Sequence, residues 1–474
     1  MRTDSSIWSA IRGGVCCVLG FGVSGKSLIG VLLDHGAAKV RVYDKKTPEE
    51  LGPEALALVA QGVEFFGGER YLASLEGDVI FRSPGFKPWT PEIAAAVAKG
   101  AILSSEMELF MASTEACVIG VTGSDGKTTT TTLTSLLLEQ AVKARGYGKV
   151  YLGGNIGTPL MPLAHEMTPD DFAVVELSSF QLSTMQDSPR FCAVTNVTPN
   201  HLDWHPDMQD YTNAKCHIWQ GNGAQRLVTN RDNAVTYEMA GQADLPVTLF
   251  SGKLCDYQSI ARAPGDIAYF LKDGYIVRAD GQTEQRMLAV SDVLLPGAYN
   301  LENYMTAIAL TEQFITPEMI REVATTFKGV VHRFEFVREK DGVRYYNSSI
   351  DSTPSRTAAA LSNIAAGTAW VICGGYDKKV PFLPLAKVLR ERAKGVVLTG
   401  ATADLIEQAL AECLQDNPEL VVLREADFTD AVRCAASHAG AGEIVLLSPA
   451  CASFDAFKDY KQRGETFRRI VNEL

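Results

Sequence analysis

Short apolar segments of strand length alternate with helical stretches along almost the whole chain. Near the N-terminus, Val15–Leu19 is followed by a glycine-rich turn and a helical stretch, Lys39–Tyr43 ends at an aspartate, and Asp78–Arg82 ends at Ser-Pro-Gly. This alternation is typical of βαβ units, in which helices cover a parallel sheet. The pattern therefore predicts an α/β protein.

The same pattern separates three blocks, which we predict to be domains of residues 1–112, 113–327 and 328–474. The central block begins with the apolar strand Ala116–Val121 and contains a β-rich insertion at Ile267–Val277, where Asp273-Gly274 is a typical hairpin turn. A helix over about 301–314 closes it. The third block is predicted to be a second open α/β domain with strands at Val343–Asn347, Ala369–Cys373, Gly395–Thr399, Leu420–Leu423 and Glu443–Leu447.

Length and charge narrow the class of protein. A chain of 474 residues is expected to form two to four domains, and 46% hydrophobic with 21% charged residues is a globular composition. The net charge of -12 argues against nucleic acid as a partner, which requires a basic face, but a local phosphate site remains compatible with it. The ten cysteines form no C-x-x-C pair, and neither a signal peptide nor a membrane span is evident, so we expect reduced thiols, no membrane partner and a cytoplasmic location.

The densest motif is Thr122–Thr128, which reads T-G-S-D-G-K-T between an apolar strand and a predicted helix. Such a glycine turn directs several N–H groups and the positive end of the helix dipole at a phosphate. Lys127 is placed to reach the β- and γ-phosphates, and Thr128 to bind Mg²⁺ through its hydroxyl. The first glycine of a full P-loop pattern is displaced to Gly120, so an accidental glycine turn is the alternative. The predicted ATP contacts here are Gly123, Ser124, Asp125, Gly126, Lys127, Thr128 and Thr129.

Two further polar segments follow apolar strands in the same block. Glu176 ends the strand Phe172–Val175, where a carboxylate is suited to Mg²⁺, and the strand Cys192–Val197 leads to a loop that contains His201. Lys215 lies fourteen residues beyond that histidine. Taken alone, these three residues also have ordinary structural interpretations: a solvated carboxylate, a structural histidine and a solvated cation.

The first block carries a formal dinucleotide fingerprint. Gly20, Gly22 and Gly25 have the G-x-G-x-x-G spacing, and Asp44 follows about twenty residues later. An NAD-dependent dehydrogenase is one interpretation, although any diphosphate at a helix N-terminus requires the same turn. Because the later blocks contain a predicted ATP site and no evident hydride-transfer site, we favour a nucleoside diphosphate.

Taken together, the motifs resemble the Mur ligases, which build the peptide stem of bacterial peptidoglycan. The resemblance rests on T-G-x-x-G-K-T, G-G-N-I-G at 153–157, E-L-S-S-F-Q at 176–181 and N-H-L-D-x-H before a lysine. It implies a Rossmann-like UDP-binding domain, a central P-loop ATPase-type domain and a C-terminal Rossmann-like domain. It also implies two Mg²⁺ ions and a carbamylated Lys215, with metal ligands Thr128, Glu176, His201 and Lys215.

The resemblance continues to the end of the chain. Gly297–Asn303 resembles the family's G-x-H-N-x-x-N with Tyr299 in place of histidine, which implies an adenine contact for Asn303. His332-Arg333-Phe-Glu335 implies that Arg333 lies near the γ-phosphate. Together, this H-R-F-E segment and S-P-A-C-A-S-F-D at 448–455 resemble the family member that adds D-glutamate. That resemblance implies D-glutamate contacts at Lys378, Ser453 and Tyr460.

The implied substrates are ATP, D-glutamate and UDP-N-acetylmuramoyl-L-alanine, bound by a monomer. Lys127, Glu176, His201, Lys215 and Arg333 are the implied catalytic residues. Contacts to the UDP precursor are expected from Gly22, Val23, Ser24, Asp44, Lys45, Ser83, Pro84, Gly85, Asn155 and His201.

One motif departs from the family pattern. Where D-glutamate ligases commonly have N-D-S-K-A-T, this chain has Asn347-Ser-Ser-Ile-Asp-Ser. Ser348 thus replaces an aspartate and Ile350 a lysine, so either Asp351 takes over a nucleotide contact or these contacts are rearranged. The alternatives are a family member adding another amino acid, a folate-glutamylating relative, and a nucleotide-binding regulator that has lost ligation.

Overall fold

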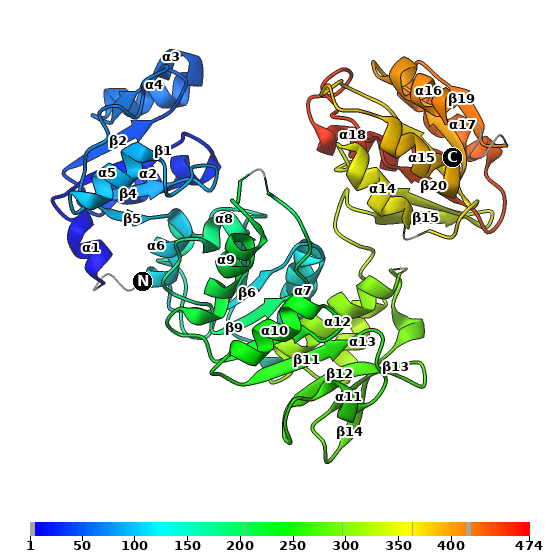
Figure 1. The fold of residues 1–474 in the computed structure, drawn as a ribbon, viewed down its shortest axis with the longest axis horizontal. Helices are drawn as coiled ribbons and strands as arrows, with labels where there is room; N and C mark the ends of the chain where they lie inside the picture. Colours follow the sequence, from blue (N-terminus) through cyan, green and yellow to red (C-terminus); the bar gives the residue numbers. More distant parts are fainter. Residues whose placement is uncertain (1–4, 203, 296, 363, 414–418) are drawn as a thin grey trace. The chain divides into compact units, whose positions relative to one another are not determined.

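A computed structural model describes residues 5–202, 204–295, 297–362, 364–413 and 419–474. The chain forms two compact units: Met1–Asp292 with Ala298–Ala324, and Val293–Gly297 with Thr325–Leu474. The first unit contains two sheets and the second contains one (Figure 1). The predicted α/β class is confirmed, while the bounds of the three predicted domains stay a prediction.

The first sheet is parallel throughout, in the order β3-β2-β1-β4-β5. The strand order reverses between β1 and β4, which is where doubly wound sheets bind ligands. The strands are β1 Val15–Leu19, β2 Lys39–Tyr43, β3 Glu64–Phe66, β4 Val79–Arg82 and β5 Ile102–Ser104. The helices are α1 Ser6–Ile11, α2 Val23–Asp34, α3 Pro48–Leu51, α4 Pro53–Ala60, α5 Pro91–Ala98 and α6 Glu106–Ser113.

The second sheet has nine strands in the order β14-β13-β12-β11-β10-β9-β6-β8-β7. Its strands are β6 Cys117–Thr122, β7 Val150–Gly154, β8 Phe172–Glu176, β9 Phe191–Val194, β10 Arg226–Asn230, β11 Val247–Ser251, β12 Ile267–Lys272, β13 Tyr275–Ala279 and β14 Glu284–Ala289. The helices are α7 Lys127–Arg145, η1 Met161–Leu163, α8 Ser179–Leu182, α9 Met208–Gln220, α10 Ala234–Gln242, α11 Tyr257–Ile260, η2 Val290–Asp292, α12 Ala298–Thr311 and α13 Pro317–Ala324.

The β-rich insertion is an antiparallel extension of this sheet. Lys272 and Tyr275 pair across the turn, where Asp273 and Gly274 both have positive φ, so the predicted Asp-Gly hairpin is confirmed. Helix α12 begins three residues earlier than the predicted helix.

The third sheet has the order β15-β16-β20-β17-β18-β19, with β15 antiparallel to β16 and the other pairs parallel. Each strand predicted in this block is present to within two residues. The strands are β15 Glu335–Lys340, β16 Val343–Asn347, β17 Ala369–Cys373, β18 Ala393–Leu398, β19 Val421–Arg424 and β20 Ile444–Leu447. The helices are α14 Pro354–Ser362, α15 Leu383–Arg392, α16 Ala403–Glu412, α17 Phe428–His438 and α18 Tyr460–Glu473.

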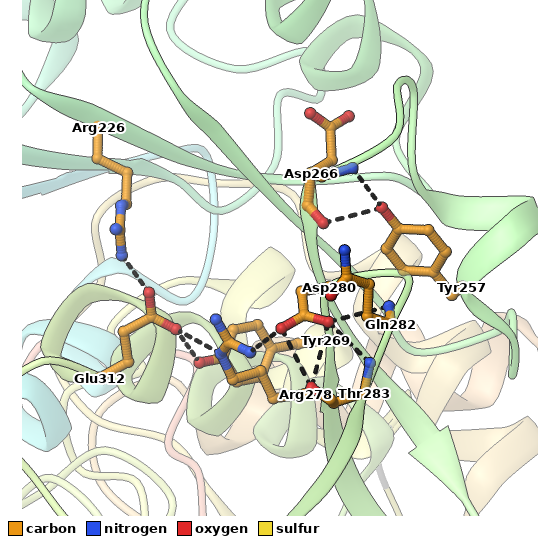
Figure 2. Close-up of polar contacts among 10 residues, drawn as sticks. Arg226, Tyr257, Asp266, Tyr269, Arg278, Asp280, Gln282, Thr283 and Glu312 are labelled. Atoms are coloured by element: carbon orange, nitrogen blue, oxygen red, sulfur yellow. Dashed lines mark hydrogen bonds and ion pairs between the residues drawn. The ribbon is translucent and has the colours of Figure 1, made fainter.

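A partly buried ionic cluster joins the end of α12 to the sheet extension (Figure 2). The Glu312 carboxylate accepts hydrogen bonds from the Tyr269 hydroxyl at 2.7 Å and from Arg278 Nε at 3.1 Å, and it forms an ion pair with Arg226. Burial raises the pKa of Tyr269 well above its usual value, and the neighbouring Glu312 adds to this shift. The cluster therefore links α12 to strands β10, β12 and β13.

All ten cysteines are free thiols, as predicted. Within the described ranges, no helix combines the length and apolar character that crossing a bilayer requires.

Candidate active site

The glycine turn between β6 and α7 packs closely against neighbouring residues. Gly126 has φ +80° and caps the nineteen-residue helix α7, and Gly123 has φ +148°. A Cβ added to Gly123 would lie 1.9 Å from Thr195 Oγ1, and one added to Gly126 would lie 2.5 Å from Asn303 Oδ1. Only glycine fits both positions, and the turn places the first N–H groups of α7 at a helix N-terminus, which favours an anion.

Lys127 and Asp125 complete this turn. Lys127 Nζ donates to the carbonyl oxygens of Gly123 and Ser124, each at 2.9 Å, so its ammonium group lies against the turn. Asp125 N donates to Asn196 Oδ1 at 2.9 Å, which joins the turn to the loop after β9. Positive charge and N–H donors thus gather where a triphosphate was predicted. Thr129 is half-buried on the first turn of α7.

Glu176 lies beside the glycine turn because β8 is the neighbour of β6, with Val121 opposite Glu176 in the register. Its side chain is buried, and Oε2 accepts from Thr128 Oγ1 at 2.7 Å. Oε1 accepts from Asn155 Nδ2 at 2.9 Å. The structure therefore brings together three predicted residues, one hydroxyl, one carboxylate and one amide, from α7, β8 and the residue that follows β7.

Lys215 is almost fully buried, with 1% of its surface exposed. Nζ donates to the Gly123 carbonyl oxygen at 2.8 Å and lies 4.5 Å from the ring centroid of Tyr211. Burial lowers the pKa of this amine well below its usual value, and the charge of Lys127 lowers it further, while Asp125 and Glu176 act in the opposite direction. A buried amine with a lowered pKa therefore lies directly behind the glycine turn.

His201 lies on the loop after β9 with φ +56°, and its exposed ring meets Phe180 edge-on at 4.9 Å. The buried histidine of this loop is His205 instead. Its Nδ1 is 2.6 Å from Asp210 Oδ2 and its Nε2 is 2.9 Å from Ser179 Oγ. His205 therefore fixes the loop, while His201 remains exposed. Asp203 of the same motif lies outside the described residues.

Asn303, the predicted adenine contact, is buried on α12 against the back of the glycine turn. Its Oδ1 accepts from Thr130 Oγ1 at 3.1 Å, and its Nδ2 donates to Asn300 Oδ1 at 3.2 Å. In this structure Asn303 thus supports the turn, and its adenine contact stays a prediction.

The predicted precursor rim gathers at the strand-order reversal of the first sheet. A Cβ on Gly25 would lie 2.2 Å from the Gly20 carbonyl oxygen, which explains the glycine spacing. Asp44 accepts from the backbone N–H of Phe21 at 2.8 Å and of Lys46 at 3.0 Å, so it ties the loops after β1 and β2 together. The rim also contains Gly22, the N-cap of α2, followed by Val23, Ser24, Lys45, Ser83, Pro84 and Gly85.

In the second unit, the H-R-F-E segment forms a tight turn before β15. His332 N donates to Glu335 Oε2 at 2.9 Å, and Asn347 Nδ2 donates to the same oxygen at 3.0 Å. Arg333 follows His332 in this turn and interacts electrostatically with Asp351. Asp351 is buried and accepts from Ser448 Oγ at 2.8 Å. This burial favours rearranged nucleotide contacts over a direct replacement by Asp351.

The predicted D-glutamate residues lie on neighbouring loops of the third sheet. Ser453 is buried, Tyr460 begins α18, and Lys378 Nζ donates to Ser352 Oγ at 3.1 Å. Arg463 Nη2 donates to the carbonyl oxygens of Cys451 at 3.1 Å and of Ser349 at 2.9 Å. This buried guanidinium therefore holds the loop of Ser453 against the loop after β16.

The sequence analysis assigned no role to Asn196, Tyr211 or His205, although His205 ends the quoted motif N-H-L-D-x-H. Tyr211 lies four residues before Lys215 on α9, and its hydroxyl is 2.9 Å from Ser124 Oγ. The four-residue spacing on a helix was a usable signal, because it places both side chains on one face. Asn196 offered no comparable pattern.

Family models match most of the chain. The Mur ligase middle domain matches residues 121–311, and the Mur ligase glutamate ligase domain matches residues 332–451. A UDP-N-acetylmuramate-alanine ligase from Thermotoga maritima has the same fold, with a TM-score of 0.55 at 16% identity, covering 97% of this chain and 99% of that structure. A UDP-N-acetylmuramoyl-L-alanyl-D-glutamate–2,6-diaminopimelate ligase gives a TM-score of 0.53 at 17% identity, covering 87% and 96%. The class is thus that of the ATP-dependent Mur ligases.

Sequence relatives extend over the full length. UDP-N-acetylmuramoylalanine–D-glutamate ligase from Acetivibrio thermocellus is 42% identical over 96% of both chains, and that from Clostridium novyi is 41% identical over 100% of both. The chain therefore belongs to the Mur ligase family and, within it, to the UDP-N-acetylmuramoylalanine–D-glutamate ligases.

Proposed function

We propose that this chain joins D-glutamate to UDP-N-acetylmuramoyl-L-alanine at the expense of ATP, as a cytoplasmic monomer that makes a peptidoglycan precursor. The full-length relatives support the choice of substrates. The structural observation that carries the proposal is the convergence of Glu176 and Lys215 on the glycine turn. Thr128 Oγ1 lies 2.7 Å from Glu176, and Lys215 Nζ lies 2.8 Å from the Gly123 carbonyl oxygen.

The first step activates the precursor. A carboxylate is a poor acyl donor because oxide would have to leave, so the L-alanyl carboxylate oxygen attacks the γ-phosphorus of ATP. The bond to the β,γ-bridging oxygen breaks, which gives an acyl phosphate and ADP. Lys127 and the N–H groups of Gly126, Lys127 and Thr128 stabilise the charge on the transferred phosphoryl group, and Arg333 is proposed to contribute to the same stabilisation.

The donor set fits Mg²⁺. The Thr128 hydroxyl and the Glu176 carboxylate are oxygen ligands of the kind that Mg²⁺ prefers. A carbamate formed from the Lys215 amine and carbon dioxide would add an anionic oxygen, and the lowered pKa of this buried amine favours the neutral form that attacks carbon dioxide. We propose that Thr128, Glu176, His201 and carbamylated Lys215 hold two Mg²⁺ ions. When bound, these ions would neutralise charge between ATP and the carboxylate.

The second step forms the amide. The D-glutamate amine attacks the acyl carbon, and the tetrahedral intermediate collapses with loss of phosphate. Lys378, Ser453 and Tyr460 are proposed to bind D-glutamate. The UDP portion is assigned to the first-sheet rim, with Asn155 and His201 toward the sugar and phosphates.

Phosphate release measured with ATP, Mg²⁺ and the UDP precursor tests the proposal when amino acids are varied. We expect release with D-glutamate and a product heavier by one glutamyl residue in mass spectrometry. Preference for L-alanine, a diamino acid or a D-alanine dipeptide would instead indicate another activity of the family. No release with any of them would favour the regulator.

The metal and oligomer assignments need separate measurements. Intact-mass analysis under carbon dioxide, with Lys215→Met as the control, should detect a carbamate on the wild-type chain only. Light scattering should give the 51.3 kDa monomer, and a dimer mass would contradict that assignment.

A further inference from the structure

The side chain of Arg82 extends from the first sheet to helix α8, which belongs to the region of the second sheet. Arg82 is the last residue of β4, next to the proposed precursor rim at Ser83–Gly85, and only 3% of its surface is exposed. Nη2 donates to the Phe180 carbonyl oxygen at 2.6 Å, to Ser183 Oγ at 2.8 Å and to Thr184 Oγ1 at 3.0 Å. These acceptors belong to α8 and the residues immediately after it.

The buried charge of Arg82 is stabilised by the neighbouring Glu108 and by hydrogen-bond acceptors. Burial lowers the pKa of the guanidinium to about 10, so it stays charged at neutral pH. A buried cation is costly unless it is hydrogen-bonded, and here Nη1 and Nη2 both have acceptors, while Nε has none among the described residues. Nη1 donates back to the Phe86 carbonyl oxygen at 3.2 Å. The guanidinium therefore holds the loop after β4 and helix α8 together.

Helix α8 in turn supports the loop of His201. The helix follows Glu176 after two residues, and the ring of its Phe180 contacts His201 at 4.9 Å and Trp204 at 4.8 Å. Ser179 Oγ is 2.9 Å from His205 Nε2. A displacement of α8 would therefore move the aromatic surface on which His201 rests.

A second contact links the same two regions. Trp89, on the loop after β4, meets Trp204 edge-on, with ring centroids 5.0 Å apart. Arg82 and Trp89 thus both attach the segment that follows β4 to the assembly of Phe180, His201 and Trp204. Polar and aromatic contacts at two separate points make this segment and α8 one connected body.

We propose that Arg82 is a positioning residue that couples precursor binding at Ser83–Gly85 to the placement of α8 and His201 beside the ATP site. This inference rests on the proposed precursor site and deepens it. It predicts that the precursor and ATP each strengthen the binding of the other, since both favour the same position of α8. Such reciprocity is required of any true coupling between two sites.

Calorimetric titration of the full chain with UDP-N-acetylmuramoyl-L-alanine, with and without Mg²⁺ and β,γ-methylene-ATP, measures this coupling. For the wild type we expect the nucleotide to tighten precursor binding about fivefold or more. Arg82→Met should reduce that factor to about one while leaving nucleotide affinity in the absence of precursor unchanged. Arg82→Lys should retain part of the coupling, because it keeps the charge. Arg70→Met, at an exposed arginine in the turn after β3, is the matched control and should behave as wild type.

A second variant tests the other side of the contact, in case Arg82→Met does not fold. Ser183→Ala with Thr184→Val removes two of the three acceptors of Nη2 without touching the first sheet, and it should lower the coupling in the same direction. A wild type without coupling, or wild-type coupling in these variants, would overturn the role of Arg82. A wild type that binds no precursor would overturn the proposed function itself, so the two failures are distinguishable.

Discussion

At the scale of single residues, the sequence places the predicted site residues at one edge of the sheet. It does not predict which of their side chains are in contact. Glu176 could be predicted to face Mg²⁺ because it ends a strand next to the strand of the glycine turn. The structure adds that both of its oxygens are held, by Thr128 and by Asn155. A carboxylate restrained in this way is preorganised, so its charge can act without further rearrangement.

Glu176→Gln keeps the size of this side chain and removes its charge. We expect kcat to fall about 100-fold or more because one preorganised charge is lost. Initial rates across a Mg²⁺ titration measure the effect. Glu139→Gln, at an exposed glutamate of α7, should leave the rates unchanged. Wild-type rates in Glu176→Gln would exclude the carboxylate from the metal site.

Gly123→Ala tests the backbone of the turn. The left-handed φ of +148° and the 1.9 Å approach to Thr195 Oγ1 both oppose a Cβ, so a loss of about 1–3 kcal/mol in unfolding free energy is expected, with weaker nucleotide binding. Gly30→Ala in α2 meets no atom within 4 Å and should be neutral or stabilising by about 1 kcal/mol. Chemical denaturation and titration with an ATP analogue compare the two. Equal stabilities would show that the turn relaxes.

At the scale of elements, α12 illustrates what sequence periodicity can and cannot provide. Its helical pattern was predictable, but the Glu312 cluster that anchors its end to the sheet extension involves residues 34 to 86 positions apart (Figure 2). Because α12 carries Asn300 and Asn303, which contact each other behind the glycine turn, the cluster also stabilises the site.

Glu312→Gln leaves Arg226 and Arg278 without their shared carboxylate. Because the cluster is only partly buried, we expect a loss of about 1–3 kcal/mol, less than for a fully buried pair, and a drop in the melting temperature of the first unit. Glu284→Gln, which disrupts the exposed pair with Lys272, should cost less than about 1 kcal/mol. Differential scanning calorimetry distinguishes these outcomes. Similar losses in both variants would show that the Glu312 cluster contributes no more stability than an exposed ion pair.

At the scale of the whole molecule, helix α6 connects the two sheets of the first unit and carries Glu108, a half-buried acid whose Oε2 atom is buried. Burial raises the pKa of Glu108 to about 8, while the neighbouring Arg82 lowers it in part and Asp187 raises it slightly. The folded state therefore binds a proton that the unfolded state has released between pH 4.5 and about 8. Stability from this group is present below pH 4.5 and is lost as the pH rises through that window.

Glu108→Gln should remove this dependence. We expect the unfolding free energy of the variant to exceed that of wild type by about 1 kcal/mol at pH 5 and by about 4 kcal/mol at pH 8. Urea unfolding at both pH values measures this difference. A constant difference between the two proteins would mean that Glu108 is charged in the folded state.

The sequence by itself determined the strand order along the chain, the glycine turns and the family motifs, because these depend on local periodicity and on backbone conformations that few residues adopt. Each predicted strand of the third sheet is present to within two residues. Only the tertiary structure decided that Lys215 is buried against Gly123, that Asp351 faces inward to Ser448, and that Arg82 reaches α8. These contacts join residues about 90 to 100 positions apart, and burial and desolvation, which set their charges, exist only after the chain has packed.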